Sequence, residues 1–299
     1  MTTFHPDLAL GRFIPSLSMS PRLLKLMGDA KPKVPPVPDD MTIEDVQAGS
    51  VSLRVYRPKS LTGRAPALLW IHGGGFLNGS PEQDERSSTD FARELGITVI
   101  SLRYRLGPAN PSPAAVEDAY AGLLYTFAHE GVDPSRVAIG GASAGGGLAA
   151  SLALYAHDKG GVAPVFQLLV YPMLDDRTVT RTDHNTRGVR VWTTGSNRFG
   201  WTSYLGHEPG LPTASVYAAP ARREDLSGLP PAWIGVGTLD LFFDEDVAYA
   251  KRLLDAGVPC DTTIIPGAFH GFDAIFPNKP VSREFWSEQA RVLRAALLD

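Results

Sequence analysis

The sequence predicts an α/β fold with a mostly parallel central sheet of about eight strands, flanked by helices. Short apolar, β-branched segments recur along the 299 residues, and longer helical patterns separate them. Such alternation is typical of βαβ crossovers and of parallel sheets covered on both faces. Two regions, 1–45 and 175–229, interrupt this alternation of strand and helix patterns. The predicted strands are 51–57 (VSLRVYR), 66–72 (PALLWIH), 97–103 (ITVISLR), 136–141 (RVAIGG), 166–172 (FQLLVYP), 232–237 (AWIGVG) and 260–266 (CDTTIIP).

The segments between the strands carry helical patterns. Two of them end in glycine stops, with FAREL followed by Gly96 and AKRLLDA by Gly257, as is common at helix C-termini. The predicted helices lie at 84–95, 113–130, 143–158, 244–257 and 281–297.

The two interruptions predict a cap over the carboxyl ends of the strands. Region 1–45 holds a short helical pattern, SPRLLKLMG, and then KPKVPPVPDD, which reads as an extended connector because proline breaks regular helix. Region 175–229 follows the predicted strand 166–172, which we expect to be the sixth of about eight strands, and an insertion of this length is usually a lid or binding loop. We therefore expect a main α/β domain made of 46–174 and 230–299, covered by a helical cap made of the N-terminal segment and the insertion.

Composition and charge favour a small-molecule partner. The formal net charge is −4 and no long basic block occurs, so we expect no nucleic-acid partner and no anionic membrane surface. Cys260 is the only cysteine, which excludes an intrachain disulfide and a cysteine metal site and fits a reducing compartment. The N-terminus has no secretion-signal pattern, and the apolar runs stop well short of the roughly 18 residues of a membrane span. These features predict a cytoplasmic protein.

One glycine-rich stretch predicts a nucleophile. Ser143 stands in Gly141-Ala142-Ser143-Ala144-Gly145, a G-x-S-x-G pattern directly after a predicted strand and directly before a predicted helix. This is the context of a nucleophile elbow, in which small neighbours allow a strained strand-to-helix turn. The Ala144 N–H and the helix dipole could then stabilise an oxyanion. The alternative, a phosphate-binding turn, is disfavoured because the stretch lacks the G-x-x-x-x-G-K-[ST] lysine.

A second glycine cluster predicts an oxyanion hole. His72-Gly73-Gly74-Gly75 ends an earlier strand, and consecutive glycines let backbone N–H groups approach a developing negative charge without side-chain obstruction. His72 could be taken for a general base, but its place beside the glycines favours a hydrogen bond that supports the loop.

Three motifs in order carry a family resemblance: HGGGF, YRLGPANPSPAAVEDAYAGL at 104–123, and GASAGGG. Across 40–299 the chain resembles the bacterial hormone-sensitive-lipase-like (family IV) esterases of the α/β-hydrolase superfamily. The resemblance implies the α/β-hydrolase fold and hydrolysis of short- to medium-chain carboxylic esters through an acyl-enzyme, with no metal or organic cofactor. Many relatives carry Asp or Thr where this chain has Ala142.

The resemblance also implies the acid and the base. Asp240 lies just beyond a predicted strand, where the family keeps its triad acid. Asp244, Glu245 and Asp246 follow, and these have a separate explanation as first-turn carboxylates favoured by the helix dipole. His270 follows the last predicted strand and completes the chain order Ser…Asp…His expected of these hydrolases.

The identity of the substrate is less defined. The same triad would serve an amidase, a lactonase or a carbamate hydrolase, and a non-catalytic hydrolase-fold ligand-binding protein is a further alternative. Relatives often dimerise near the last strand and helix, so a homodimer is also expected. Aromatic and apolar residues that could line the substrate pocket, or equally pack the cap on the main domain, are Phe76, Leu77, Trp192, Phe199 and Trp201.

Overall fold

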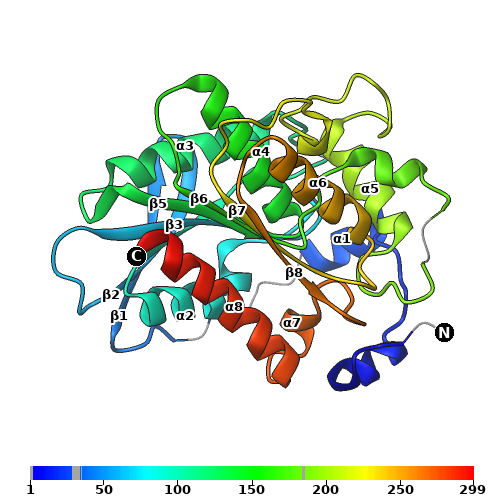
Figure 1. Ribbon diagram of the computed structural model, residues 1–299, viewed down its shortest axis with the longest axis horizontal. Helices are drawn as coiled ribbons and strands as arrows, with labels where there is room; N and C mark the ends of the chain where they lie inside the picture. Colours follow the sequence, from blue (N-terminus) through cyan, green and yellow to red (C-terminus); the bar gives the residue numbers. More distant parts are fainter. Residues whose placement is uncertain (1–2, 29–33, 35, 184–185) are drawn as a thin grey trace.

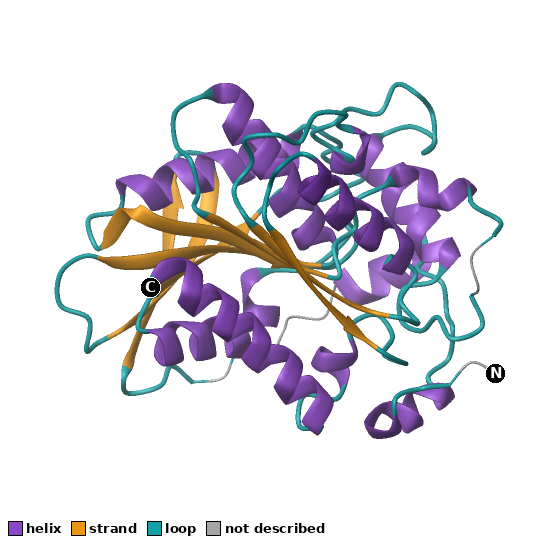
Figure 2. Cartoon of the chain, in the orientation of Figure 1, coloured by secondary structure: helices purple, strands orange, loops and turns teal. Residues whose placement is uncertain are grey.

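The computed structural model describes residues 3–28, 34, 36–183 and 186–299, and its centre is one eight-stranded sheet (Figures 1 and 2). The strand order is β1-β2-β4-β3-β5-β6-β7-β8. Strand β2 runs antiparallel to both β1 and β4, and every other neighbouring pair is parallel. The predicted fold class is therefore confirmed. The strands are β1 (Met41–Ala48), β2 (Val51–Pro58), β3 (Ala65–Ile71), β4 (Thr98–Arg103), β5 (Val132–Ala142), β6 (Phe166–Val170), β7 (Ala232–Gly237) and β8 (Cys260–Ile265).

Helices cover both faces of this sheet, as Figure 1 shows, with α3, α4 and α6 on one side and α2 and α8 on the other. The α-helices are α1 (Pro21–Gly28), α2 (Glu85–Leu95), α3 (Ala114–Ala128), α4 (Ala144–Lys159), α5 (Thr194–Leu205), α6 (Phe243–Asp255), α7 (Phe272–Ile275) and α8 (Pro280–Leu297). The 3₁₀ turns are η1 (Pro6–Phe13), η2 (Pro81–Asp84), η3 (Asp176–Thr180) and η4 (Pro220–Arg222).

The central strand β3 shows why both faces need a cover. Its side chains alternate between the two faces. Leu69 and Ile71 belong to the apolar cluster that contains the buried side of α3 and α4, whereas Leu68 and Trp70 belong to the cluster of α2 and α8. All four side chains are buried. The continuous apolar run of this strand in the sequence is the consequence of burial on both faces.

Strand β1 is a strand that the sequence analysis did not locate. It pairs along its whole length with β2, from Met41 opposite Pro58 to Ala48 opposite Val51. The N-terminal cap segment was predicted to extend to residue 45, but 41–45 lies in the sheet. An edge strand can carry exposed polar side chains, as Glu44 and Asp45 do, and these hid the strand. Of the predicted connector 31–40, residues 31–33 and 35 lie outside the described part.

The N-terminal segment and the insertion after β6 are joined to each other. The hydroxyl groups of Ser18 and Thr193 lie 2.8 Å apart, and the Met19 N–H donates to Ser196 Oγ over 2.8 Å. The same segment reaches the main domain, where the His5 N–H donates to the Gly267 carbonyl over 3.0 Å. In Figure 1, α1 and α5 lie toward the same end of the molecule. The division into cap and main domain itself stays a prediction.

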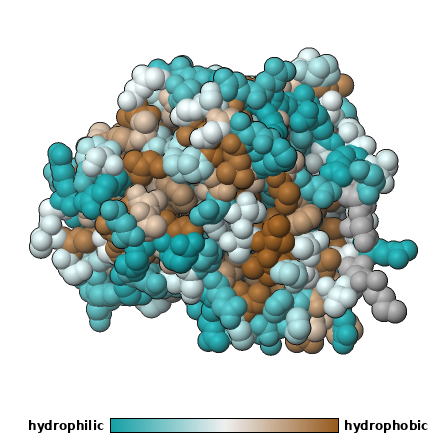
Figure 3. All heavy atoms as spheres, in the orientation of Figure 1, coloured by the Kyte–Doolittle hydropathy of each residue, from teal (hydrophilic) through white to brown (hydrophobic). Residues whose placement is uncertain are grey.

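Strand β8 forms the second edge of the sheet. Its Ile264 side chain is 43% exposed, and hydrophobic surface gathers over this strand in Figure 3. The expected homodimer through the last strand and helix stays a prediction. None of the helices in the described ranges combines the length and the apolar character needed to cross a bilayer.

Candidate active site

Ser143 occupies a strained turn between β5 and α4. Its φ of 58° and ψ of −122° lie outside the usual regions for a residue with a side chain. The Ser143 N–H donates to the Val170 carbonyl over 2.9 Å, and the Ser143 carbonyl accepts the N–H of Met173 over 3.0 Å. Glycine is required beside it, because a Cβ at Gly145 would lie 2.0 Å from the Ile71 carbonyl oxygen. These contacts fix the serine at the carboxyl end of the sheet.

The structure brings Ser143, His270 and Asp240 together from three separate loops. His270 Nε2 lies 2.8 Å from Ser143 Oγ, and His270 Nδ1 lies 2.8 Å from Asp240 Oδ2. The three residues are only 5 to 7% exposed. The second carboxylate oxygen of Asp240 accepts the Phe242 N–H over 2.9 Å, which fixes the orientation of the carboxylate.

This geometry defines what the three side chains can do. Because Asp240 is an acceptor, the neutral imidazole of His270 carries its proton on Nδ1. Its Nε2 is then free to accept the proton of the Ser143 hydroxyl. The arrangement is that of a nucleophile, a general base and an orienting carboxylate.

The glycine loop predicted as an oxyanion hole lies against this serine. A Cβ at Gly73 would lie 3.3 Å from Ser143 Cβ, and Gly74 and Gly75 adopt φ values of 116° and 63°. Among the described residues, no backbone carbonyl accepts the N–H of Gly74, Gly75 or Ala144. The role of these N–H groups as an oxyanion hole stays a prediction.

His72 supports the glycine loop. Its Nδ1 lies 2.8 Å from the Gly73 carbonyl oxygen, its ring stacks on Tyr104 at 4.4 Å, and the Tyr104 hydroxyl donates to the His72 carbonyl over 3.0 Å. Burial lowers the pKa of His72 to about 4. The imidazole is therefore neutral near pH 7 and donates Nδ1–H to the loop, as expected of a supporting residue.

The buried imidazole of His72 makes stability depend on pH. An unfolded histidine titrates near 6.5, so between about pH 4 and 6.5 the unfolded chain binds more protons than the native one. The free energy of unfolding therefore falls as the pH drops through this window, by about 2 kcal/mol between pH 7 and 5 from this residue. Urea unfolding of the His72→Asn variant should show a correspondingly smaller loss between these two pH values.

His207 provides the matched control for this prediction. It makes the same contact, with Nδ1 2.9 Å from the carbonyl of the next residue, but it is only half-buried. The His207→Asn variant should keep the pH dependence of the wild type. An unchanged pH dependence in His72→Asn would contradict a buried neutral His72.

The three acidic residues after Asp240 have different environments. Asp244 is exposed and pairs with Arg181 at 3.0 Å. Glu245 is buried and accepts the N–H groups of Leu174 and Asp175 over 2.7 and 3.1 Å. It thereby anchors the start of the insertion, a role beyond that of a first-turn carboxylate that the sequence did not reveal.

Asp246 is fully buried, and neither of its carboxylate oxygens has a hydrogen-bond partner among the residues that the structure describes. Burial raises the pKa of Asp246, and the neighbouring carboxylates of Glu245 and Asp240 raise it further. Of the acidic residues in this loop and the first turn of α6, Asp240 is the one that contacts the imidazole of His270.

The five candidate pocket residues differ in their packing. Trp192 lies directly over the glycine loop, since a Cβ at Gly75 would lie 1.9 Å from its ring. Phe76 stacks on Tyr204 at 3.8 Å, and Trp201 packs on Phe76 at 5.9 Å and is fully buried. Leu77 is buried in the apolar cluster that includes α3 and α4, and the half-buried Phe199 packs against that cluster. Contact with a substrate stays a prediction for all five.

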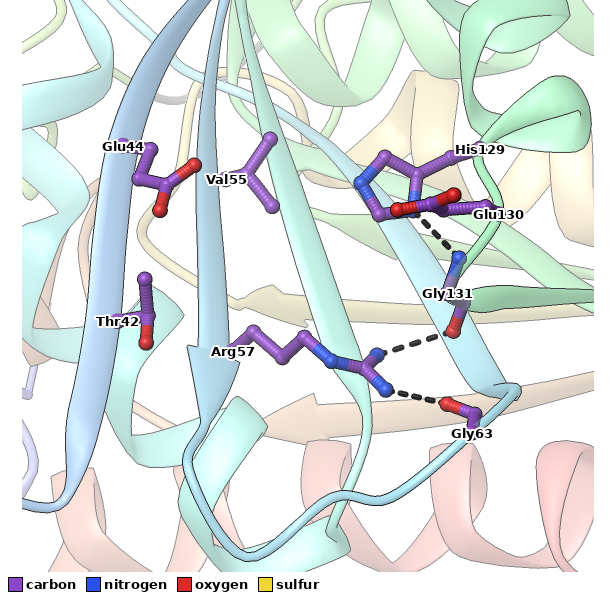
Figure 4. Close-up of a pocket in the computed structure, with 8 residues that line it drawn as sticks. All are labelled: Thr42, Glu44, Val55, Arg57, Gly63, His129, Glu130 and Gly131. Atoms are coloured by element: carbon purple, nitrogen blue, oxygen red, sulfur yellow. Dashed lines mark hydrogen bonds between the residues drawn. The ribbon is translucent and has the colours of Figure 1, made fainter.

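A depression of about 460 Å³ lies at the opposite end of the strands (Figure 4). Arg57 is one of the residues that line it, donates to the Gly131 carbonyl over 2.9 Å and also bonds the Gly63 carbonyl. Glu44 and His129 also line it, and the His129 Nδ1 accepts the Gly131 N–H over 3.1 Å. Ligands of open α/β sheets bind at the carboxyl ends of the strands, so this depression is not the candidate active site.

The fold and the strand-to-helix turn at Ser143 are those of the α/β hydrolases. This chain belongs to the alpha/beta hydrolase fold family, whose model matches residues 68–274.

Named relatives confirm the resemblance drawn from the motifs. The chain is 37% identical to the carboxylic ester hydrolase LipN of Mycobacterium tuberculosis over 84% of its own length and 68% of that protein. It is 31% identical to the carboxylesterase NlhH of the same species, over 89% of its own length and 86% of that protein. The solved structure of a bacterial heroin esterase superposes with a TM-score of 0.89 and 35% identity, and the match covers 99% of both chains.

Proposed function

We propose that this protein is a serine carboxylesterase in which Ser143 is the nucleophile, His270 the general base and Asp240 the orienting acid. The observation that carries the proposal is the continuous chain of two 2.8 Å contacts from Asp240 through His270 to Ser143. The family membership and the esterase names of the relatives support the same reaction.

Acylation begins when the Ser143 hydroxyl attacks the ester carbonyl carbon and transfers its proton to His270 Nε2. Asp240 stabilises the imidazolium that forms. The carbonyl oxygen gains negative charge and accepts hydrogen bonds from N–H groups of the Gly73–Gly75 loop and from Ala144. Loss of one such donor typically raises the barrier by about 2.7–4 kcal/mol. Collapse of the intermediate expels the alcohol, which takes the proton from His270, and leaves an acyl group on Ser143.

Deacylation uses the same groups in reverse order. His270 removes a proton from a water molecule, which attacks the acyl carbonyl while the same N–H groups hold the oxyanion. The proton then returns to Ser143 Oγ as the acid leaves. The residues of this chain supply every proton donor and acceptor that the reaction needs.

The substrates that we propose are carboxylic esters with short to medium acyl chains. The indole ring of Trp192 closes over Gly75, and Trp192 and Phe76 are both buried. Bulky apolar side chains beside the oxyanion loop favour a bounded apolar pocket over an open surface for aggregated lipid.

A series of p-nitrophenyl esters from acetate to long chain, together with the matched p-nitroanilides, tests this proposal. We expect turnover of the short and medium esters, a fall for long chains, and little hydrolysis of the anilides. Faster cleavage of the anilides than of the esters would contradict the proposal and indicate an amidase. Binding of esters without turnover would favour a ligand-binding protein and contradict the proposal.

A further inference from the structure

Backbone hydrogen bonds hold Tyr171 next to the turn that carries Ser143. It follows β6 directly and has a φ of 36°, in the left-handed region that costs energy for a residue with a side chain. Its N–H donates to the Gly235 carbonyl over 2.7 Å, and the carbonyl of the preceding residue, Val170, accepts the Ser143 N–H over 2.9 Å. A rigid main-chain connection therefore links Tyr171 to the nucleophile turn.

The side chain of Tyr171 reaches the histidine and its segment at the same time. The ring packs edge-on against the imidazole of His270, with centroids 4.8 Å apart and planes at 63°. The hydroxyl donates to Asp273 Oδ1 over 2.9 Å, and Asp273 lies three positions after His270 in α7. Tyr171 is only 5% exposed, so it has little freedom to move.

We propose that Tyr171 and Asp273 are positioning residues that hold His270 at hydrogen-bond distance from Ser143. Tyr171 contacts the imidazole directly, while Asp273 acts through the tyrosine hydroxyl. This inference rests on the proposed role of His270 as general base. Its physical basis is that a displacement of about 1 Å in a reacting group can cost about 10²-fold in rate.

Charged and polar groups around the pair explain why the hydroxyl matters. Burial raises the pKa of Asp273, while the hydrogen bond from Tyr171 and the charge of His270 oppose that rise. Asp84 is a second nearby carboxylate, and it accepts the Trp70 Nε1–H over 2.8 Å. Burial raises the pKa of Asp84 to about 6, and the charge of Asp273 contributes. Without the tyrosine hydroxyl, the Asp273 carboxylate loses one hydrogen-bond donor while the Asp84 carboxylate remains nearby. This favours movement of the segment that carries His270.

Four variants separate positioning from general stability. Tyr171→Phe removes only the hydroxyl, Asp273→Asn keeps an oxygen that can accept it, Asp273→Ala removes the acceptor, and the fourth combines Tyr171→Phe with Asp273→Ala. With a p-nitrophenyl ester we expect Tyr171→Phe and Asp273→Ala to lower kcat about tenfold with little change in KM. Asp273→Asn should retain most of the wild-type kcat. The double variant should be no slower than either single variant, because Tyr171→Phe and Asp273→Ala each remove the same hydrogen bond.

Tyr217 supplies the control, since its hydroxyl donates to Asp158 Oδ2 over 2.7 Å in a pair that does not touch His270. Tyr217→Phe should keep the wild-type kcat. Equal kcat in the wild type and Tyr171→Phe, or a raised KM with unchanged kcat, would overturn the proposal. If the wild type hydrolyses no ester, the proposed function fails. The rate at which a phosphonate labels Ser143 in the wild type and Tyr171→Phe then tests the positioning alone, with slower labelling of the variant as the supporting result.

Discussion

Replacement of Ser143 by alanine is expected to lower kcat/KM for a short p-nitrophenyl ester by about 10⁶-fold, as removal of the nucleophile does in a serine hydrolase. The side chain is buried in a turn that the backbone alone holds, through the Val170 and Met173 hydrogen bonds. Loss of the hydroxyl should therefore leave the fold intact while removing the atom that attacks the ester. Steady-state kinetics and the melting temperature of Ser143→Ala test both statements.

Ser151 is the matched control for this variant. It lies two turns further along α4, is buried, and its hydroxyl has no hydrogen-bond partner in the described structure. We expect Ser151→Ala to retain the wild-type kcat/KM. Activity that survives in Ser143→Ala but not in Ser151→Ala would contradict the assignment of the nucleophile.

Asp240→Asn is expected to lower kcat about 10⁴-fold, the loss typical of a wrong histidine tautomer. The Phe242 N–H needs an acceptor at the position of Oδ1, so the amide oxygen of the new asparagine should stay there and its NH₂ group should face His270. The histidine would then accept at Nδ1 and carry its proton on Nε2. An imidazole in this tautomer cannot take the proton of Ser143. The pH profile of kcat and the residual rate at saturating ester measure the effect.

Asp244 is the control for this second variant, because it is a carboxylate of the same segment that does not contact His270. Its carboxylate is half exposed, with a side-chain exposure of 47%, and pairs with Arg181. Asp244→Asn should keep kcat near the wild-type value. A large loss in Asp244→Asn together with an active Asp240→Asn would exchange the two roles.

The parts of the fold that could be predicted from the sequence are those whose burial is continuous along the chain. Strand β3 is buried on both faces and is an unbroken apolar run, so its position was evident. Strand β1 has a polar exposed side and was missed, since pairing along an edge leaves no apolar pattern. Strand β5 begins at Val132, four residues earlier than predicted, because Asp133 and Pro134 are typical turn residues.

The candidate site also has features that could be predicted from the sequence and features that could not. The Ser143 turn and the Gly73–Gly75 loop each occupy one short stretch, because close backbone approach demands consecutive small residues, and both were visible in the sequence. Contacts between distant positions leave no local signal. Tyr171 and Asp273 are 102 positions apart, and Glu245 is 71 positions from Leu174.

Covalent labelling of the serine tests the central claim most directly. The wild type is incubated with a p-nitrophenyl phosphonate, the p-nitrophenol released in the first turnover is counted, and the modified peptide is sequenced by tandem mass spectrometry. We predict one equivalent of p-nitrophenol per chain, a phosphonyl group on Ser143, and neither signal in Ser143→Ala. A label on another residue, or ester turnover by the wild type with no label on Ser143, would contradict the account.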